Sequence, residues 1–240
     1  MPSQPQPFTG VVALDGPAGT GKSTVAQRLA DRLGIHYLDT GAMYRAATVA
    51  VLQAGVDPSD AESVTAVVRD SRIEVSLDPQ AQRTVLNGVD VSTAIRSQQT
   101  TAAVSAVSAI GRVRELLVAQ QRELIRRGAS AAQGSVGTVA EGRDIGSVVW
   151  PDAELKVYLT AREDVRARRR AGQLGDEDLA GIAASMRRRD AFDSGRAVSP
   201  LRRPDGAIEV DTSDLSIDEV VELLAELARR QFPVTAADRG

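Results

Sequence analysis

The strongest constraint on this chain is a glycine-rich stretch near its start, where residues 16–23 read GPAGTGKS. The stretch matches the pattern G-x-x-x-x-G-K-[ST] at every fixed position, and it directly follows the apolar run VVALD at residues 11–15. Apolar residues then recur every four positions across residues 22–33, which predicts a helix. A buried strand, a glycine-rich turn and a helix form the context in which backbone N–H groups wrap around phosphate.

The motif assigns a role to each kind of residue in it. Glycines allow backbone conformations and close approaches that a Cβ atom would block. Lys22 is expected to reach the β- and γ-phosphates of a nucleotide, and the Ser23 hydroxyl to bind Mg²⁺. Only two of the 29 basic residues are lysines, so a lysine in the loop fits a position that needs a compact ammonium group. The predicted ATP-binding residues are Gly16, Pro17, Ala18, Gly19, Thr20, Gly21, Lys22, Ser23 and Thr24.

Composition narrows the other classes of function. The formal net charge of −3 and the small number of aromatic residues (three Phe, three Tyr and one Trp) argue against a nucleic-acid-binding protein. The absence of cysteine excludes disulfides and zinc–thiolate sites and fits a cytosolic protein. Residues 1–9 lack the basic and apolar segments of a signal peptide and are expected to be disordered. No apolar run is long enough for a membrane span, so we expect a cytoplasmic protein without membrane or nucleic-acid partners.

Strand-like and helix-like segments alternate along the rest of the chain. This alternation predicts one α/β domain over residues 10–235, with a central parallel sheet covered by helices on both faces. The strand-like runs are HYL at 36–38, TVAEGRD at 138–144, AELKVYLT at 153–160 and AIEVDTS at 207–213. The helical patterns begin near Gly41 and cover 98–127 and 216–231, with a loop at 128–137.

Two features interrupt this alternation. Residues 72–91 alternate apolar and polar side chains around Asn87-Gly88, which predicts a small antiparallel sheet within an insert at about 62–97. The pattern of residues 59–62 predicts a capping box that opens a helix, and residues 160–163 predict a second helix start. The helix after residue 163 belongs to a segment, about 161–190, that we expect to act as a mobile lid.

Arginines crowd this lid helix. Four of them share one face at spacings of four, seven and eight residues, and like charges at a spacing of four repel each other. Such a face is useful where polyphosphate docks against it, although a solvated helix or a nucleic-acid patch would have the same pattern. The four arginines are Arg162, Arg166, Arg169 and Arg170.

Other arginines follow the ends of predicted strands, where α/β sheets bind their ligands. Arg45 and Arg143 stand in such positions, and Gly142 and Asp144 flank Arg143. The residues alone leave the roles of Arg112, Arg114 and Arg189 open, as they do for Asp15 before the loop, and His36 is interpreted as structural. No N-K-x-D sequence is present, which disfavours a GTPase, and TVAEGRDIG is the nearest approach to a strand that ends in a metal-binding acid.

Taken together, six segments resemble the bacterial cytidylate kinases, a group of nucleoside monophosphate kinases, from Val11 to about Arg230. The resemblance implies a three-layer P-loop kinase with an antiparallel insert and a helical lid. We expect the protein to be a monomer. It also implies transfer of the ATP γ-phosphate to CMP or dCMP with Mg²⁺. The segments are DGPAGTGKST, LDTGAMYR, NGVDVSTAIRS, VSAVSAIGRVRELL, AEGRDIGSVVWPDAELKVYL and RDAFDSGRAVSPL.

The resemblance carries site roles over to matching positions. Ser105, Arg114 and Asp144 match residues that read the cytosine, and Asp39 and Thr40 match a pair near the base and phosphate. The residues that match the monophosphate and ribose contacts are Arg45, Arg143, Arg196, Arg189 and Asp193. The predicted catalytic cations are Lys22, Arg143, Arg162 and Arg166. The alternatives are another small-molecule kinase (for AMP, UMP, shikimate or gluconate), a nucleotide-dependent switch, and a nucleic-acid-binding ATPase.

Overall fold

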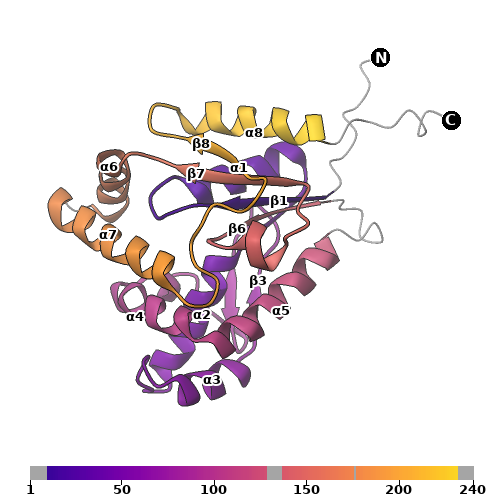
Figure 1. Ribbon diagram of the computed structural model, residues 1–240. Helices are drawn as coiled ribbons and strands as arrows, with labels where there is room; N and C mark the ends of the chain where they lie inside the picture. The colour runs from indigo at the N-terminus through magenta and orange to yellow at the C-terminus, as the bar shows by residue number, and fades with distance from the viewer. Residues whose placement is uncertain (1–9, 129–136, 176, 232–240) are drawn as a thin grey trace.

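The computed structural model describes residues 10–128, 137–175 and 177–231 (Figure 1). Its centre is a five-stranded sheet in the order β2-β6-β1-β7-β8, in which every neighbouring pair is parallel. The carboxyl ends of the strands therefore meet at one edge, with β1 in the middle. The strands are β1 (Gly10–Asp15), β2 (His36–Asp39), β6 (Gly137–Glu141), β7 (Leu155–Thr160) and β8 (Ile208–Asp211).

Helices cover both faces of this sheet and make three layers. Alternate side chains of β1 explain the arrangement, because Val12 and Leu14 point to one face and Val11 and Ala13 to the other. On the first face lie α1 (Lys22–Leu33) and α8 (Ile217–Gln231). On the second face lie α2 (Thr40–Gln53), α4 (Gln98–Ala109) and α5 (Gly111–Gly128). The predicted three-layer α/β class is confirmed.

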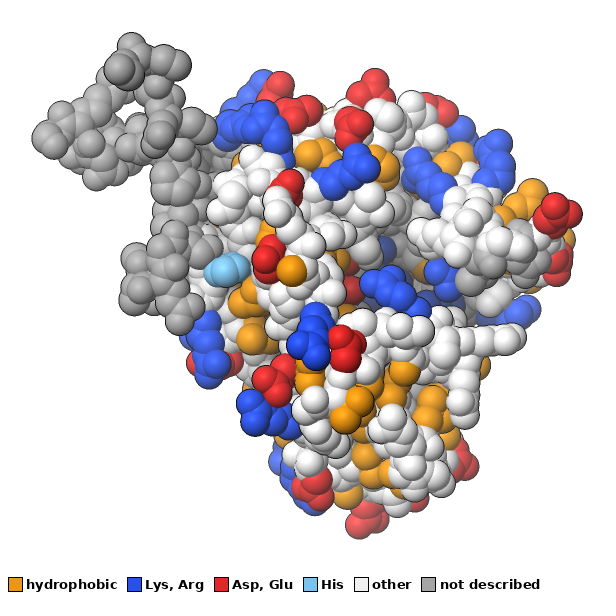
Figure 2. All heavy atoms as spheres, turned by 180° about the vertical axis from the view of Figure 1, so that it is seen from behind, with side chains coloured by type: hydrophobic (Ala, Val, Ile, Leu, Met, Phe, Trp, Pro, Cys, Tyr) orange, Lys and Arg blue, Asp and Glu red, His pale blue; other side chains and the backbone are white. Residues whose placement is uncertain are grey.

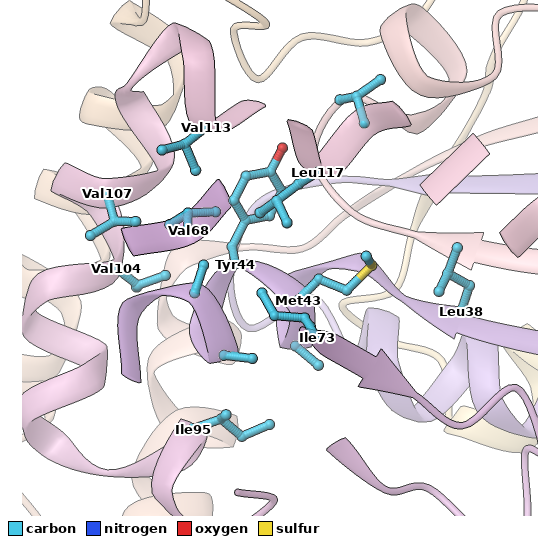
Figure 3. Packing of buried hydrophobic residues seen from close by; sticks show 14 of the residues in the cluster. Leu38, Met43, Tyr44, Val68, Ile73, Ile95, Val104, Val107, Val113 and Leu117 are labelled. Atoms are coloured by element: carbon cyan, nitrogen blue, oxygen red, sulfur yellow. The ribbon is translucent and has the colours of Figure 1, made fainter. Parts of the chain in front are cut away.

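The core on the second face is shown in Figure 3. Met43 and Leu38 are fully buried there, and Val107 and Val113 bring α4 and α5 against α2. Tyr44 belongs to the same cluster, although its ring also reaches the wall of a pocket described below. Each large apolar side chain buried in this way contributes about 1.5–3 kcal/mol relative to exposure. The cluster thus fixes the helix that carries Tyr44 and Arg45.

The insert forms a second, antiparallel sheet of three strands, β3 (Ile73–Val75), β4 (Thr84–Leu86) and β5 (Val89–Asp90). The predicted hairpin turn is confirmed, since Asn87 and Gly88 both have positive φ, 51° and 83°. The short helices α3 (Ala61–Arg69) and η1 (Ala94–Arg96) flank this sheet in the sequence. The N–H of Tyr37 donates to the carbonyl of Leu77, so the insert is tied to the edge strand β2.

Three local predictions need correction. The N-cap of α3 is Asp60, whose carboxylate accepts the N–H groups of Glu62 and Ser63, while the Ser59 hydroxyl donates to Asp57 instead. Thr160 belongs to β7 and caps no helix; α6 (Glu163–Leu174) begins after Arg162 without a side-chain cap. The helical pattern at 98–127 is two helices that break at Ile110, whose extended backbone ends α4.

The α6 helix and α7 (Leu179–Gly195) form a helical hairpin beside the carboxyl edge of the sheet (Figure 1). A small core holds them together, made of Ala167 and Ala171 from α6 and of Ile182 and Met186 from α7, with Ala18 packed against it. No helix among the described residues is long and apolar enough to cross a membrane. The predicted tail at 1–9 and most of the predicted loop at 128–137 lie outside the described residues.

Candidate active site

The glycine-rich loop between β1 and α1 is shaped by its glycines. Gly16, Gly19 and Gly21 have φ values of +148°, +77° and +89°, which side-chain-bearing residues rarely adopt. A Cβ atom on Gly16 would lie 2.2 Å from the carbonyl oxygen of Leu159, so the neighbouring strand β7 leaves no room for it. The lack of space and the positive φ therefore require glycine at position 16, as the motif predicts.

Lys22 is buried and lies over the loop. Its Nζ donates to the carbonyl of Pro17 at 2.5 Å, and the Thr20 hydroxyl lies 3.5 Å away. Burial and the nearby Arg143 guanidinium hold the pKa of Lys22 well below its usual range, while Glu141 opposes them. A cation held in this way gains from any anion that enters the loop.

A carboxylate of the lid lies on the loop. Asp190 of α7 accepts the N–H of Ala18 at 3.3 Å and pairs with Arg166 of α6 at 2.5 Å. Arg166 also donates to the Ala18 carbonyl at 3.1 Å. Asp190 therefore contacts a backbone N–H of the kind that the motif uses for phosphate.

The other lid arginines point elsewhere. Arg162 makes a two-pronged contact with Asp214 at 2.7 and 2.8 Å, and about half of its side chain is exposed. Arg169 donates to the carbonyl and hydroxyl of Thr212, and Arg170 to Gln173. The sequence groups these arginines on one face with Arg166, but in the described structure Arg166 is the member that reaches the loop.

Oxygen atoms suited to Mg²⁺ gather beside Ser23. The Glu141 carboxylate, at the end of β6, is 3% exposed and accepts the Tyr37 hydroxyl at 2.6 Å. Burial and repulsion from Asp39 raise the pKa of Glu141 to about 7, while Lys22 and the Ser23 hydroxyl act in the opposite direction. Hydroxyl and carboxylate oxygens are the ligands that Mg²⁺ prefers, so these residues fit the ion.

Glu141 and Tyr37 were not identified from the sequence. The available signal was the apolar run TVA that ends in a carboxylate just before Gly142. The sheet order identifies Glu141 as a candidate metal ligand. Strand β6 lies directly between β1 and β2, which brings Glu141 next to the loop.

A pocket lies next to the loop, lined by side chains of α2, α4, α5 and α7 and by the segment that follows β6. Figure 2 shows Lys and Arg side chains gathered in the hollow between the upper and lower parts of the molecule. Eight of the ten residues predicted to bind the acceptor line the pocket. Its lining is Thr40, Gly41, Tyr44, Arg45, Val104, Ser108, Arg114, Gly142, Arg143, Asp144, Arg189, Asp193 and Arg196.

The two remaining predicted residues lie outside this lining. Asp39 caps α2, where its carboxylate accepts the N–H of Ala42 at 2.9 Å. The carbonyl of Ser105 accepts the hydroxyl of Ser108, and Ser108 lines the pocket. Ser108 is thus a pocket residue that the sequence did not single out, whereas Tyr44 belongs to the segment LDTGAMYR that marks this site in the sequence.

One side of the pocket is strongly cationic. Arg45 is held by the Ile95 carbonyl at 2.8 Å and by the Thr101 hydroxyl at 2.9 Å, and Arg143 by Asp193 at 3.2 Å. Burial, together with the charges of Arg143 and Arg45, lowers the pKa of Arg189 to about 10. Neighbouring guanidinium groups repel one another, and a phosphate dianion bound between them would relieve this repulsion.

The other side contains a buried ion pair. Arg114 and Asp144 lie 2.5 Å apart, with side chains 3% and 5% exposed. Arg114 also donates to the Ser108 carbonyl and stacks over the Tyr44 ring, 5.1 Å from its centre. The Nε of Arg114 has no hydrogen-bond partner within the described part of the chain. A planar ligand with its own donors and acceptors would complete this region.

The family model for cytidylate kinase matches residues 12–230. The chain belongs to the cytidylate kinase family. The cytidylate kinase of Mycolicibacterium paratuberculosis is 50% identical over 229 residues, covering 93% of this chain and 97% of the relative. That of Nocardia farcinica is 49% identical over 232 residues, covering 95% and 97%. The predicted resemblance is confirmed, and the alternative kinases and the switch are not favoured.

Among solved structures, a gluconokinase from Sinorhizobium meliloti aligns over 94% of each chain, at 15% identity and a TM-score of 0.49. At that distance the likeness carries no argument about the acceptor. By contrast, the match to the cytidylate kinase family model covers residues 12–230, which include the loop, the pocket residues and the lid.

Proposed function

We propose that this member of the cytidylate kinase family transfers the γ-phosphate of ATP to CMP or dCMP, giving ADP and CDP or dCDP. Family membership supports this reaction. The observation that carries the choice of acceptor is one pocket beside the loop, with arginines on one side and the Arg114–Asp144 pair on the other. The first side suits a phosphate and the second suits a polar planar base.

On the donor side, residues 16–24 hold the triphosphate of ATP. Ser23 and Glu141 would hold Mg²⁺, which supplies neutralisation of the phosphate charge. Lys22 contacts the phosphates from the loop, and Arg166 contacts them from the lid after Asp190 has left the Ala18 N–H group. Arg162 is assigned to the same lid set from the resemblance, and it would have to exchange Asp214 for phosphate.

On the acceptor side, each residue has a proposed role of its own. Ser105, Arg114 and Asp144 read the base, and Asp39 and Thr40 lie near the base and phosphate. The monophosphate and ribose contacts are assigned to Arg45, Arg143, Arg196, Arg189 and Asp193. Arg143 and Arg189 both line the pocket and both lie close enough to Lys22 to lower its pKa, so these two arginines lie between the donor and acceptor sides.

The chemistry needs little beyond position and charge. A phosphate oxygen of CMP is already an anion near neutral pH, so it attacks the γ-phosphorus without losing a proton to a base. Lys22, Arg143 and Arg166 offset the charge of two phosphate groups that otherwise repel each other. Closure of α6 and α7 would exclude water, which competes with CMP as the acceptor.

Base selection follows from hydrogen bonding. The amino group of cytosine donates to a carboxylate such as that of Asp144, and its carbonyl oxygen and ring nitrogen accept from a guanidinium such as that of Arg114. Uracil presents a carbonyl where cytosine has the amino group, which leaves a buried acceptor unpaired. Sites of this kind reject the wrong ligand by factors of up to about 10⁴–10⁵.

The test is ADP production from Mg-ATP with CMP, dCMP, UMP, AMP or no acceptor, run in parallel. We expect rapid turnover with CMP and dCMP and slow turnover with UMP and AMP. Equal rates with UMP and CMP would refute the assigned base reading, and hydrolysis independent of any acceptor would refute the kinase assignment. A monomeric state, a cytoplasmic location and the lack of nucleic-acid or membrane partners remain predictions from the sequence.

A further inference from the structure

Asp15, the last residue of β1, binds a segment far away in the sequence. Its side chain is fully buried, with Oδ1 accepting the N–H of Ile145 and Oδ2 that of Gly146, each at 2.8 Å. These are the first two N–H groups of η3 (Ile145–Val149), a single π-helical turn. One carboxylate thus holds the turn that directly follows Arg143 and Asp144.

The segment between β6 and this turn is tied to β1 at both of its ends. On the N-terminal side of Arg143 and Asp144, the N–H of Gly142 donates to the Leu14 carbonyl at 3.0 Å. After it, the two N–H groups bind Asp15. The backbone of Asp144 itself lies outside the helix and strand regions, at φ −147° and ψ 25°. The direction of its side chain, and of Arg143 beside it, therefore depends on these anchors.

Burying the Asp15 carboxylate lowers the stability of the folded state. Burial raises the pKa of Asp15 to about 6, even though the two N–H groups favour the charged form. The nearby Asp144 charge also disfavours ionisation of Asp15, and Lys22 favours it. An apolar residue would avoid this cost but would leave the N–H groups of Ile145 and Gly146 without their acceptor.

Asp15 also stands immediately before Gly16, the first residue of the phosphate-binding loop. Asp15 is therefore adjacent to the donor site in the sequence, and its side chain binds the segment next to the acceptor site. The backbone N–H groups that it holds belong to residues next to Asp144, which pairs with Arg114 on the base side of the pocket.

We propose that Asp15 is a positioning residue for the acceptor: it orients Arg143 and Asp144 through the N–H groups of Ile145 and Gly146. The inference rests on the proposed function, because it takes the pocket that Arg143 and Asp144 line as the CMP site. Asp15 contacts no substrate in this account. Its effect is exerted on how tightly CMP binds and on how well CMP is told apart from UMP.

The test compares Asp15→Asn with wild type and with Glu154→Gln. Asparagine keeps the size of the side chain, but its amide N–H₂ group cannot accept an N–H bond. Glu154 is the matched control, because its carboxylate accepts the N–H of Val11 at 2.7 Å, at the opposite end of β1. For each protein, the KM values for CMP, UMP and ATP are measured, together with the thermal midpoint of unfolding.

We expect Asp15→Asn to raise the KM for CMP about tenfold and to leave the KM for ATP within about twofold, as for loss of one charge-assisted hydrogen bond. The CMP-to-UMP preference should fall as well, while Glu154→Gln changes neither. Parallel rises in the KM values for CMP and ATP, or an unchanged CMP-to-UMP preference, would overturn the proposal.

Asp15→Ser provides a second variant if the asparagine form does not fold, since its hydroxyl can accept one of the two N–H groups. Failure of both variants to fold would assign Asp15 to stability and overturn the proposal. Failure of the proposed function is seen separately, as wild-type protein that does not phosphorylate CMP.

Discussion

The buried pair of Arg114 and Asp144 gives the sharpest quantitative test of the structure. Both side chains are at most 5% exposed, and the charged atoms lie 2.5 Å apart. Asp144→Ala would leave the Arg114 guanidinium buried without its counter-charge. Breaking a buried pair in this way costs about 3–5 kcal/mol of unfolding free energy. For a chain of this size, that loss corresponds to a fall of about 6–20 °C in the melting temperature.

A double-mutant cycle separates the pair from its surroundings. Asp144→Ala, Arg114→Met and the double variant are unfolded in urea without nucleotides, and their free energies are compared with wild type. We expect the double variant to be more stable than the sum of the single effects predicts by about 2 kcal/mol, since it leaves no buried charge unpaired. A cost for Asp144→Ala of less than about 1 kcal/mol, as for an exposed pair, would refute the buried arrangement.

Three further predictions concern the loop, the lid and Asp15. Arg143→Ala should lower kcat/KM for CMP by a factor of about 10²–10³, far more than it lowers stability, since the buried Asp193 keeps Arg196 as a second partner; unchanged kinetics in the folded variant would contradict its role. Asp190→Asn should tighten ATP binding measured by calorimetry without CMP, because it removes the negative charge from the Ala18 N–H group; weaker binding would contradict that interpretation. Because the folded-state pKa of Asp15 is raised from 3.8 to about 6, the native state holds an extra proton in that pH interval. As the pH rises from about 4 to about 6.5, wild type should therefore lose about 2 kcal/mol of stability relative to Asp15→Asn, measured by urea unfolding at each pH; a pH-independent difference would argue against the raised pKa.

Local sequence patterns predicted the local structure well. The helix from Lys22 to Leu33 and the turn at Asn87-Gly88 follow from spacing and from backbone preference within a few residues. The helix caps were less predictable, because competing side chains decide them: the Ser59 hydroxyl binds Asp57, which leaves Asp60 as the cap.

Contacts between distant segments could not be read from the sequence. Asp190 and Ala18 are 172 positions apart, and only the docking of the lid brings them together. The arginine pattern of the lid helix marks a shared face but not its partners, and Asp214 binds Arg162 there. Glu141 becomes a candidate metal ligand only because β6 pairs with β1. The pocket residues were predicted through resemblance, and their roles stay predictions, as do those of Asp39 and Ser105, which lie outside the pocket lining.

In the proposed reaction, the γ-phosphate of ATP passes directly to the phosphate of CMP. The most direct measurement uses ATP labelled in its γ-phosphate, with CMP and Mg²⁺, and separates the products by chromatography. Direct transfer predicts that the label appears in CDP in a one-to-one ratio with the ADP formed. Label found in inorganic phosphate instead would show that water is the acceptor and would contradict direct transfer to CMP.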